Sequence, residues 1–198
     1  LRLPPNAFIF GMIAANKENP PRKGYQEALE AFAMFVKKHD EAMLLIHTQQ
    51  QSPTGFPIVQ YARELGIGEK IIIADPYTAV YNANSYHIAK LMSAIDVLLH
   101  PSQTEGFGLT PIEAASCGTP SVVARNTSQP ELVVDGVTGF IADCYTKRYT
   151  ADNSYTEVAD PKSVYEQMEK VYEALKKDKN KVSKACREHI VKNYNIDT

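Results

Sequence analysis

Residues 97–114 read VLLHPSQTEGFGLTPIEA and combine an apolar run, a glycine loop and a helix start. The apolar run, extended to residues 95–100, predicts a strand that is buried on both faces and ends at Pro101. Gly106 and Gly108 allow the unusual backbone angles that bring a loop close to a ligand. A strand, a loop and a helix in this order are typical of a mostly parallel α/β sheet.

The helix of this segment is expected over residues 110–117, with Thr110 as N-cap, Pro111 at the first helical position and Glu113 at the third. Its N-terminus would direct free N–H groups and a positive dipole end at the glycine loop, which suits a phosphate or diphosphate. A purely structural interpretation stays open: Glu113 only closes the capping box, Glu105 is a solvated carboxylate, and the glycines serve the turn. The segment matches neither the P-loop pattern nor G-x-G-x-x-G.

The same alternation of apolar runs and helical spacing covers the chain on both sides of this segment. Strands are expected at residues 8–13, 43–46, 71–74, 95–100, 121–124 and 139–141. Helices are expected at residues 25–38, 58–65, 87–94, 110–117, 129–134, 163–176 and 179–193. This order predicts an α/β fold with a doubly wound, mostly parallel sheet of about six strands.

Ligands of such sheets bind outside the carboxyl ends of the strands, so the loops that follow the strands are the candidate site. These loops are residues 14–24, 47–57, 74–86 and 100–110. His47 follows the second strand and is interpreted as a hydrogen-bonded loop residue rather than a catalyst. Residues 143–160 are expected to form a long loop, either solvated or in contact with a ligand or another domain.

Composition excludes several classes of protein. The chain has 198 residues and a net charge of −2, with 21 basic and 23 acidic residues, so no bulk field favours nucleic acid or anionic lipid. Three cysteines without a C-x-x-C pair argue against a disulfide framework or zinc site and favour a reducing, cytoplasmic compartment. No stretch approaches the ~20 apolar residues of a membrane helix. No acidic or histidine cluster has metal-ligand spacing, so no metal is expected.

Residues 105–120, EGFGLTPIEAASCGTP, closely resemble the E-x7-E segment of retaining glycosyltransferases of the GT-B fold, the "group 1" or family four set. Three further segments resemble motifs of that family in the family's order. They are Arg22-Lys23-Gly24 (its K-G element), residues 94–97 with 101–102 ("ADV…PS"), and residues 129–140, which contain Glu131 and DGVTGF.

The resemblance implies a Rossmann-like, donor-binding C-terminal half of a two-domain enzyme. It implies one domain over residues 1–198: a linker entry (1–7), the sheet and donor site (8–142), the long loop (143–160) and C-terminal helices (161–198). The expected partner is a nucleoside-diphosphate sugar, linked to UDP, GDP or ADP, with no other cofactor. The N-terminal acceptor domain is expected to be absent, so turnover by this chain alone is not expected. Peripheral membrane contact would occur only through that missing half.

By the same resemblance, the catalytic residues are Glu105, beside the transferred sugar, and Lys23, which would neutralise the diphosphate as it leaves. Glu113 would hold the ribose hydroxyls, since a carboxylate accepts two hydrogen bonds from a vicinal diol. The complete set of implied donor-binding residues is Arg22, Gly106, Phe107, Gly108, Leu109, Thr110, Glu113, Asp75, Pro76 and His100.

One departure from the family pattern concerns Met12, which stands where the family usually has a phosphate-binding arginine. Arg22 is expected to replace that arginine, or else to be a solvated loop charge. Two other functions stay open: a GT-B enzyme that is not a transferase, such as a sugar-nucleotide epimerase, and a nucleotide-binding module without catalysis.

Overall fold

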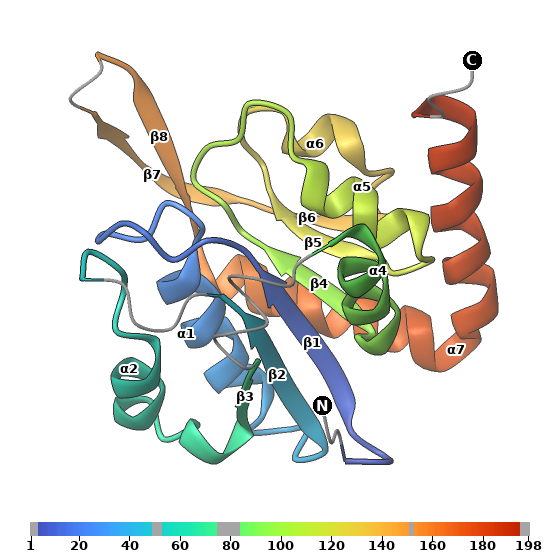
Figure 1. Cartoon of the computed structure of the whole chain (residues 1–198), viewed down its shortest axis with the longest axis horizontal. Helices are drawn as coiled ribbons and strands as arrows, with labels where there is room; N and C mark the ends of the chain where they lie inside the picture. The colour runs from blue at the N-terminus through green and yellow to red at the C-terminus, as the bar shows by residue number, and fades with distance from the viewer. Residues whose placement is uncertain (1–3, 49–52, 75–83, 151–152, 195–198) are drawn as a thin grey trace.

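The structure is a computed structural model of the chain and describes residues 4–48, 53–74, 84–150 and 153–194. Asp75 and Pro76, which were expected near the nucleobase, lie outside the described residues. Elsewhere the strands and helices follow the predicted order along the chain (Figure 1).

Six strands form one parallel sheet, which confirms the predicted fold class. The strands are β1 (Phe8–Ile13), β2 (Ala42–His47), β3 (Ile71–Ile73), β4 (Val97–His100), β5 (Ser121–Ala124) and β6 (Gly139–Ala142). Their order in the sheet is β3-β2-β1-β4-β5-β6, and every neighbouring pair is parallel. The direction of winding therefore reverses between β1 and β4, where the crevice of a doubly wound sheet binds its ligand.

Helices cover both faces of this sheet. They are α1 (Tyr25–Phe35), α2 (Ile58–Glu64), the 3-10 helix η1 (Gly68–Lys70), α4 (Ser85–Ala94), α5 (Leu109–Ser116), α6 (Gln129–Leu132) and α7 (Pro161–Asn193). Alternate residues of β1 point to opposite faces: Phe10 and Met12 pack in the core that contains α1, whereas Ile9 and Ile13 pack with α4 and α5. Both faces are thus apolar, which explains the unbroken apolar strand runs.

Helix α7 breaks at Asp178, whose backbone has φ −161° and ψ 86°, so the two C-terminal helices predicted from the sequence are confirmed. The Asp178 carboxylate accepts a hydrogen bond from the Lys181 N–H (2.9 Å) and caps the second half. The first half packs in the core with α1, and the second half packs Cys186 and Ile190 against α5 (Figure 1). The break therefore lets one helix cover parts of both faces.

The prediction of a long loop at residues 143–160 is wrong. This segment forms an antiparallel ribbon of β7 (Cys144–Tyr149) and β8 (Tyr155–Ala159), which projects from the body of the molecule (Figure 1). An ion pair between Lys147 and Glu157 (2.7 Å) and an edge contact between Tyr149 and Tyr155 join its strands. Because the ribbon is largely exposed, its polar strands lack the apolar pattern by which a buried strand is recognised.

Gly24, at the end of the loop after β1, lies against the backbone of the loop after β4. It has φ +71°, and a Cβ atom there would lie 2.1 Å from the Pro101 carbonyl oxygen. The loop after β1 is also hydrogen-bonded to the loop after β4, because Gln103 N–H (2.8 Å) and Ser102 Oγ (3.1 Å) both donate to the Arg22 carbonyl. Only glycine allows the two backbones to approach this closely.

Replacing Gly24 by alanine is expected to lower the free energy of unfolding by about 1–3 kcal/mol through its positive φ, and further through the clash with Pro101. Urea denaturation measures this change. Gly66→Ala is the matched control, because Gly66 has a similar φ of +74° with no atom within 4 Å of the added Cβ. Equal losses in both variants would show that the approach to Pro101 contributes nothing.

Candidate functional site

The centre of the site is an ion pair between the two residues predicted to be catalytic. Lys23 Nζ, on the loop after β1, lies 2.6 Å from Glu105 Oε1, on the loop after β4. The Lys23 side chain is 19% exposed and the Glu105 side chain 11%. The fold thus brings together residues 82 positions apart. Two charges held largely out of water attract each other more strongly than a surface pair does.

His100, the last residue of β4, lies beneath this pair and is 3% exposed. Its Nε2 lies 3.1 Å from the same Glu105 Oε1, although the two groups are not aligned for a hydrogen bond. Burial alone would raise the pKa of Glu105, but His100 and Lys23 outweigh it and hold that pKa well below the ordinary range. Glu105 is therefore ionised at neutral pH.

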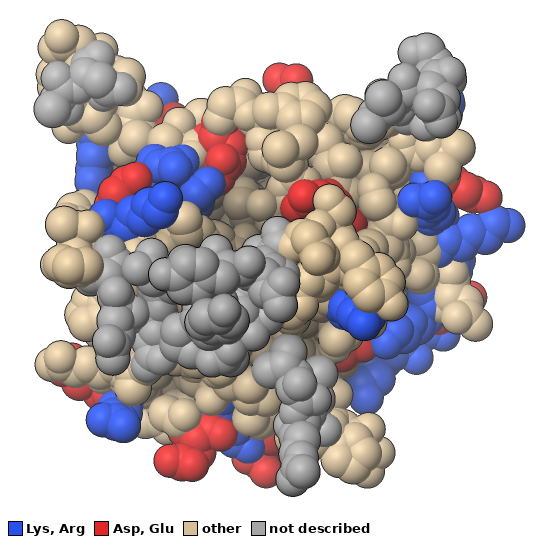
Figure 2. All heavy atoms as spheres, viewed as in Figure 1, with Lys and Arg blue, Asp and Glu red and all other residues tan. Residues whose placement is uncertain are grey.

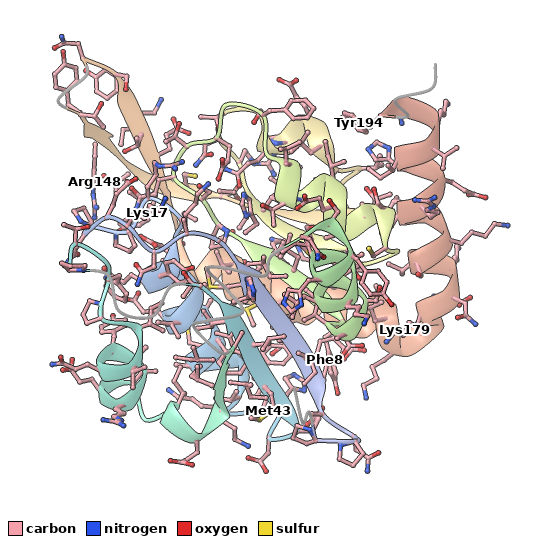
Figure 3. The ribbon with its side chains drawn as sticks, in the orientation of Figure 1. Phe8, Lys17, Met43, Arg148, Lys179 and Tyr194 are labelled. Atoms are coloured by element: carbon pink, nitrogen blue, oxygen red, sulfur yellow. The ribbon has the colours of Figure 1, made fainter. Side chains whose placement is uncertain are left out.

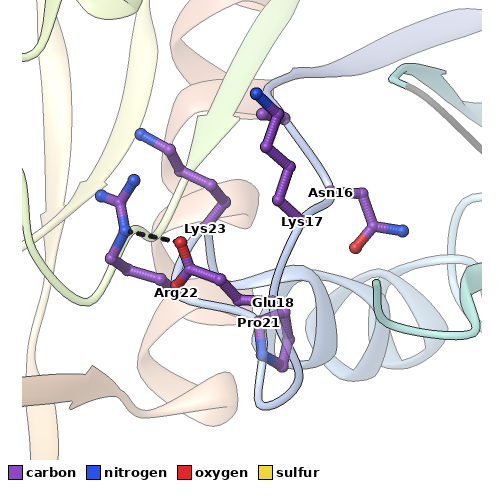
Figure 4. A pocket seen from close by; sticks show the side chains of 7 residues that line it. Asn16, Lys17, Glu18, Pro21, Arg22 and Lys23 are labelled. Carbon is purple, nitrogen blue, oxygen red and sulfur yellow. Dashed lines mark ion pairs between the residues drawn. The ribbon is translucent and has the colours of Figure 1, made fainter. Parts of the chain in front are cut away.

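Arg22 is anchored and is not a freely solvated charge. Its Nη1 donates to the Thr104 carbonyl (2.8 Å), and its Nε lies 3.5 Å from the Glu18 carboxylate. Figure 4 shows the side chains of Lys17, Arg22 and Lys23 extending toward the same side of the loop that carries them. Figure 2 shows basic atoms gathered with acidic ones near the base of the ribbon. Arg22 is thus positioned to supply a second cation beside Lys23.

This loop also encloses a small pocket of about 150 Å³ (Figure 4). The residues that line it are Ala15, Asn16, Lys17, Glu18, Pro21, Arg22 and Lys23. Figure 3 places Lys17 at the opposite edge of the sheet from Phe8, the first residue of β1. The pocket therefore lies at the carboxyl edge, where the sheet topology places the ligand.

Helix α5 has its N-cap two residues before the predicted Thr110, and the predicted capping box is wrong. Its N-cap is Gly108 with φ 92° and ψ 63°, and no side chain caps it. This left-handed conformation turns the chain before Thr110. A Cβ at Gly108 would also meet Leu132 at 2.7 Å. Because Glu113 does not cap the helix, its exposed carboxylate is free for another partner.

The start of α5 exposes the other residues of the predicted donor loop. Gly106 is exposed, Phe107 is 52% exposed, Leu109 is 64% exposed, and Thr110 is half-buried. The first N–H groups of an α-helix have no partner within the helix, so this end offers donors and a positive dipole end. The protein around Glu113 raises its pKa by desolvation.

Sequence reasoning missed the residues that hold the glycine loop in place, which follow β5. Thr127 Oγ1 accepts from the Glu105 N–H (3.1 Å), and Ser128 Oγ donates to the Phe107 carbonyl (2.9 Å). The Asn126 side chain donates to the Ser102 carbonyl (3.1 Å). It donates also to the carbonyl of Glu157 in the ribbon (3.0 Å). The available signal was a run of polar residues directly after a buried strand, at the carboxyl edge of the sheet.

Two histidines lie at the end of β2 and the start of α4. His47 is 5% exposed, and its ring centroid lies 5.5 Å from that of His87. Burial and the neighbouring His87 lower the pKa of His47, which keeps its ring neutral at pH 7. Within the described part of the chain, Nε2 of each ring lacks a hydrogen-bond partner. His47 is thus a buried residue that makes a backbone hydrogen bond, while its Nε2 has no partner among the described residues.

The described ranges hold neither a metal-ion cluster nor a membrane-spanning helix. Residues 4–48, 53–74, 84–150 and 153–194 contain no group of three or more His, Cys, Asp or Glu side chains that could hold a metal ion. Among the helices of those ranges, none has the length and apolar character needed to cross a bilayer.

Comparison with known proteins identifies the family to which this sequence is similar. Residues 12–177 match the family described as "Glycosyl transferases group 1". The chain is 27% identical over 179 residues to N-acetyl-alpha-D-glucosaminyl L-malate synthase of Bacillus anthracis, covering 80% of this chain and 44% of that protein. It is 40% identical over 88 residues to D-inositol 3-phosphate glycosyltransferase of Mycobacterium marinum, covering 44% of this chain and 17% of that protein.

Solved structures share the fold. The C-terminal domain of a group 1 glycosyl transferase of Francisella tularensis superposes with a TM-score of 0.69 at 18% identity, covering 96% of this chain and 87% of that one. Anabaena HepE, crystallised with UDP and glucose, also gives a TM-score of 0.69, at 19% identity, covering 96% of this chain and 45% of that one.

This chain spans less than half the length of these two curated relatives. The family match nevertheless extends over most of the chain, and it includes both loops of the Lys23–Glu105 pair and the start of α5. The chain belongs to the group 1 glycosyl transferases.

Proposed function

We propose that this chain is the donor-binding half of a retaining glycosyltransferase that transfers a sugar from a nucleoside diphosphate to an acceptor. The observation that carries the proposal is the half-buried Lys23–Glu105 ion pair, which lies between β1 and β4 where the direction of winding reverses. A cation and an anion held side by side suit a reaction that leaves negative charge on a diphosphate and positive charge on a sugar ring.

The diphosphate would bind between the start of α5 and the loop after β1. Backbone N–H groups at the helix N-terminus would hold its oxygens, at Leu109 and Thr110. Lys23 and Arg22 would supply the neighbouring cations. Because negative charge grows on the diphosphate as the sugar leaves, these groups stabilise the transition state more than the bound donor. The anchored position of Arg22 supports its replacing the arginine absent at Met12.

Glu105 would lie beside the transferred sugar. Its carboxylate is ionised, because His100 and Lys23 lower its pKa. It can accept hydrogen bonds from sugar hydroxyls and stabilise positive charge that develops on the ring. The hydrogen bonds that the loop makes with Thr127 and Ser128 fix its position, so little reorganisation is needed during the reaction.

Glu113 would bind the ribose through both carboxylate oxygens. Two features support this role: its side chain makes no helix cap, and desolvation already raises its pKa. A carboxylate that is partly desolvated and has no ion pair among the described residues is destabilised in the free protein. A ribose diol that donates two hydrogen bonds would remove that penalty.

The remaining parts of the proposal concern partners and surroundings. Anabaena HepE has been crystallised with UDP-glucose, which makes a uridine diphosphate sugar the first donor to test. The relatives are longer than this chain, and we assign acceptor binding to an N-terminal domain supplied by the additional length. We further propose that the reaction occurs in the cytoplasm and uses neither metal nor cofactor besides the donor.

Replacing Glu113 by glutamine is expected to weaken UDP binding about 10- to 100-fold, because hydrogen bonds to a charged acceptor contribute about 1.5–3 kcal/mol. The thermal midpoint should stay unchanged or rise. A carboxyl group with a raised folded pKa contributes stability at low pH that is lost as pH rises through that pKa, and glutamine resembles its protonated form. Calorimetry and thermal unfolding measure the two effects. Unchanged UDP affinity would remove Glu113 from the ribose site.

Replacing Lys23 by methionine is expected to weaken binding of UDP at least 10-fold while leaving the affinity for uridine unchanged, because only UDP carries the diphosphate that Lys23 would contact. The loss should shrink at high salt. Lys37→Met is the control, since Lys37 is an exposed lysine beyond the end of α1. A similar loss for uridine and UDP would indicate general disruption of the site and would contradict a diphosphate contact.

A further inference from the structure

Two nitrogen groups converge on one carboxylate oxygen at the centre of the site. Lys23 Nζ lies 2.6 Å and His100 Nε2 lies 3.1 Å from Glu105 Oε1. The lysine is well placed for a strong bond, whereas the histidine is close but not aligned for one. Lys23 is thus the closer partner of Glu105 in this structure, and His100 lies near enough to become a stronger one.

Lys23 cannot serve two anions fully at once. In the function proposed above, its ammonium group neutralises the diphosphate, yet here it is bound to Glu105. If the donor draws Lys23 away, Glu105 loses its close cationic partner while its side chain is only 11% exposed. A charge that is buried and unpaired is strongly destabilising. Sugar hydroxyls of the donor can supply hydrogen bonds to Glu105 but no positive charge, so a second cation near Glu105 would stabilise it.

His100 is the group that the structure offers for this role. His100 is 3% exposed, and its Nε2 is buried from water without an aligned hydrogen-bond partner in the described part of the chain. A buried polar atom without a partner is unusual in a folded protein and calls for an explanation. A second state, in which this nitrogen donates to Glu105, supplies one.

We infer that donor binding moves Lys23 from Glu105 to the diphosphate, and that His100 then takes up one proton from solvent and becomes the cation that holds Glu105. The neutral imidazole carries hydrogen on one ring nitrogen, and the added proton gives it hydrogen on both. No other bond changes in this step. His100 is thus a positioning residue for Glu105 and not a donor contact, and the inference rests on the proposed function.

The charged groups around His100 agree with this role. Glu105 is the one carboxylate within 4.0 Å of its ring among the described residues. From the loop after β1, Lys23 reaches the same carboxylate, while Arg22 is held by the Thr104 carbonyl and Glu18. From α1, buried Glu27 lies 3.5 Å from the Gln103 amide, and burial raises its pKa. Departure of Lys23 would therefore leave His100 beside a single uncompensated anion.

Titration calorimetry measures how many protons the protein takes up when the donor binds. UDP-, GDP- and ADP-glucose are titrated into the protein at pH 7 in buffers that differ in ionisation enthalpy. These donors suit the test because their phosphates do not titrate near neutral pH. We expect proton uptake on binding to the wild type and none in His100→Gln. We also expect the wild-type affinity to fall by up to 10-fold per pH unit as the pH rises through the neutral range, and the variant to show a flatter profile.

Two control variants separate His100 from the other histidines. The His39 ring pairs with Glu169 and not with Glu105, so His39→Gln should keep the proton uptake. His47→Gln should keep it as well; uptake that disappears in His47→Gln but not in His100→Gln would overturn the assignment. Should His100→Gln fail to fold, ¹⁵N spectra of labelled histidine in the wild type report the protonation of the His100 ring before and after donor addition.

Donor binding without proton uptake, or with equal uptake in His100→Gln, would refute the role of His100 and leave the proposed function intact. Failure of all three donors to bind would refute the proposed function and this inference with it. A His100 ring that has the same protonation state in free and donor-bound protein would also refute the inference.

Discussion

The Lys23–Glu105 ion pair is the interaction on which the site depends, and the fold creates it. The two residues follow strands that are neighbours in the sheet but far apart in the chain. Parallel strands end at the same edge, so the loops after β1 and β4 meet where the winding reverses. Gly24 then permits the two backbones to touch at Pro101. The ion pair is therefore a product of topology together with one glycine.

The rest of the carboxyl edge keeps the ion pair in place. Polar side chains after β5 hold the glycine loop from one side, and Asn126 extends this network to the ribbon. His100, at the end of β4, lies with its Nε2 3.1 Å from the Glu105 carboxylate. A rigid surround of this kind lets a buried anion remain ionised, and it fixes the direction in which the start of α5 presents its N–H groups. The chemistry thus relies on contacts made by residues without a chemical role.

Much of this could be predicted from the sequence, for identifiable reasons. The sheet followed from strands that are apolar at every position. The family resemblance named Lys23 and Glu105 as catalytic residues, but it did not predict that they pair with each other. The N-cap of α5 was misplaced by two residues, because Thr110-Pro111 is a favourable cap and only the backbone reveals that Gly108 turns first. The ribbon was missed because its exposed strands have no apolar period. The convergence of Lys23 and His100 on one oxygen is a property of distances, which a sequence does not contain.

The measurement that tests the account most directly is a crystal structure of this chain with UDP or UDP-glucose. We expect the diphosphate at the N-terminus of α5 within hydrogen-bonding distance of Lys23 Nζ, with a Lys23–Glu105 distance longer than the present 2.6 Å. Nucleotide bound at another edge of the sheet would contradict the central claim. So would a diphosphate at α5 that leaves Lys23 out of reach.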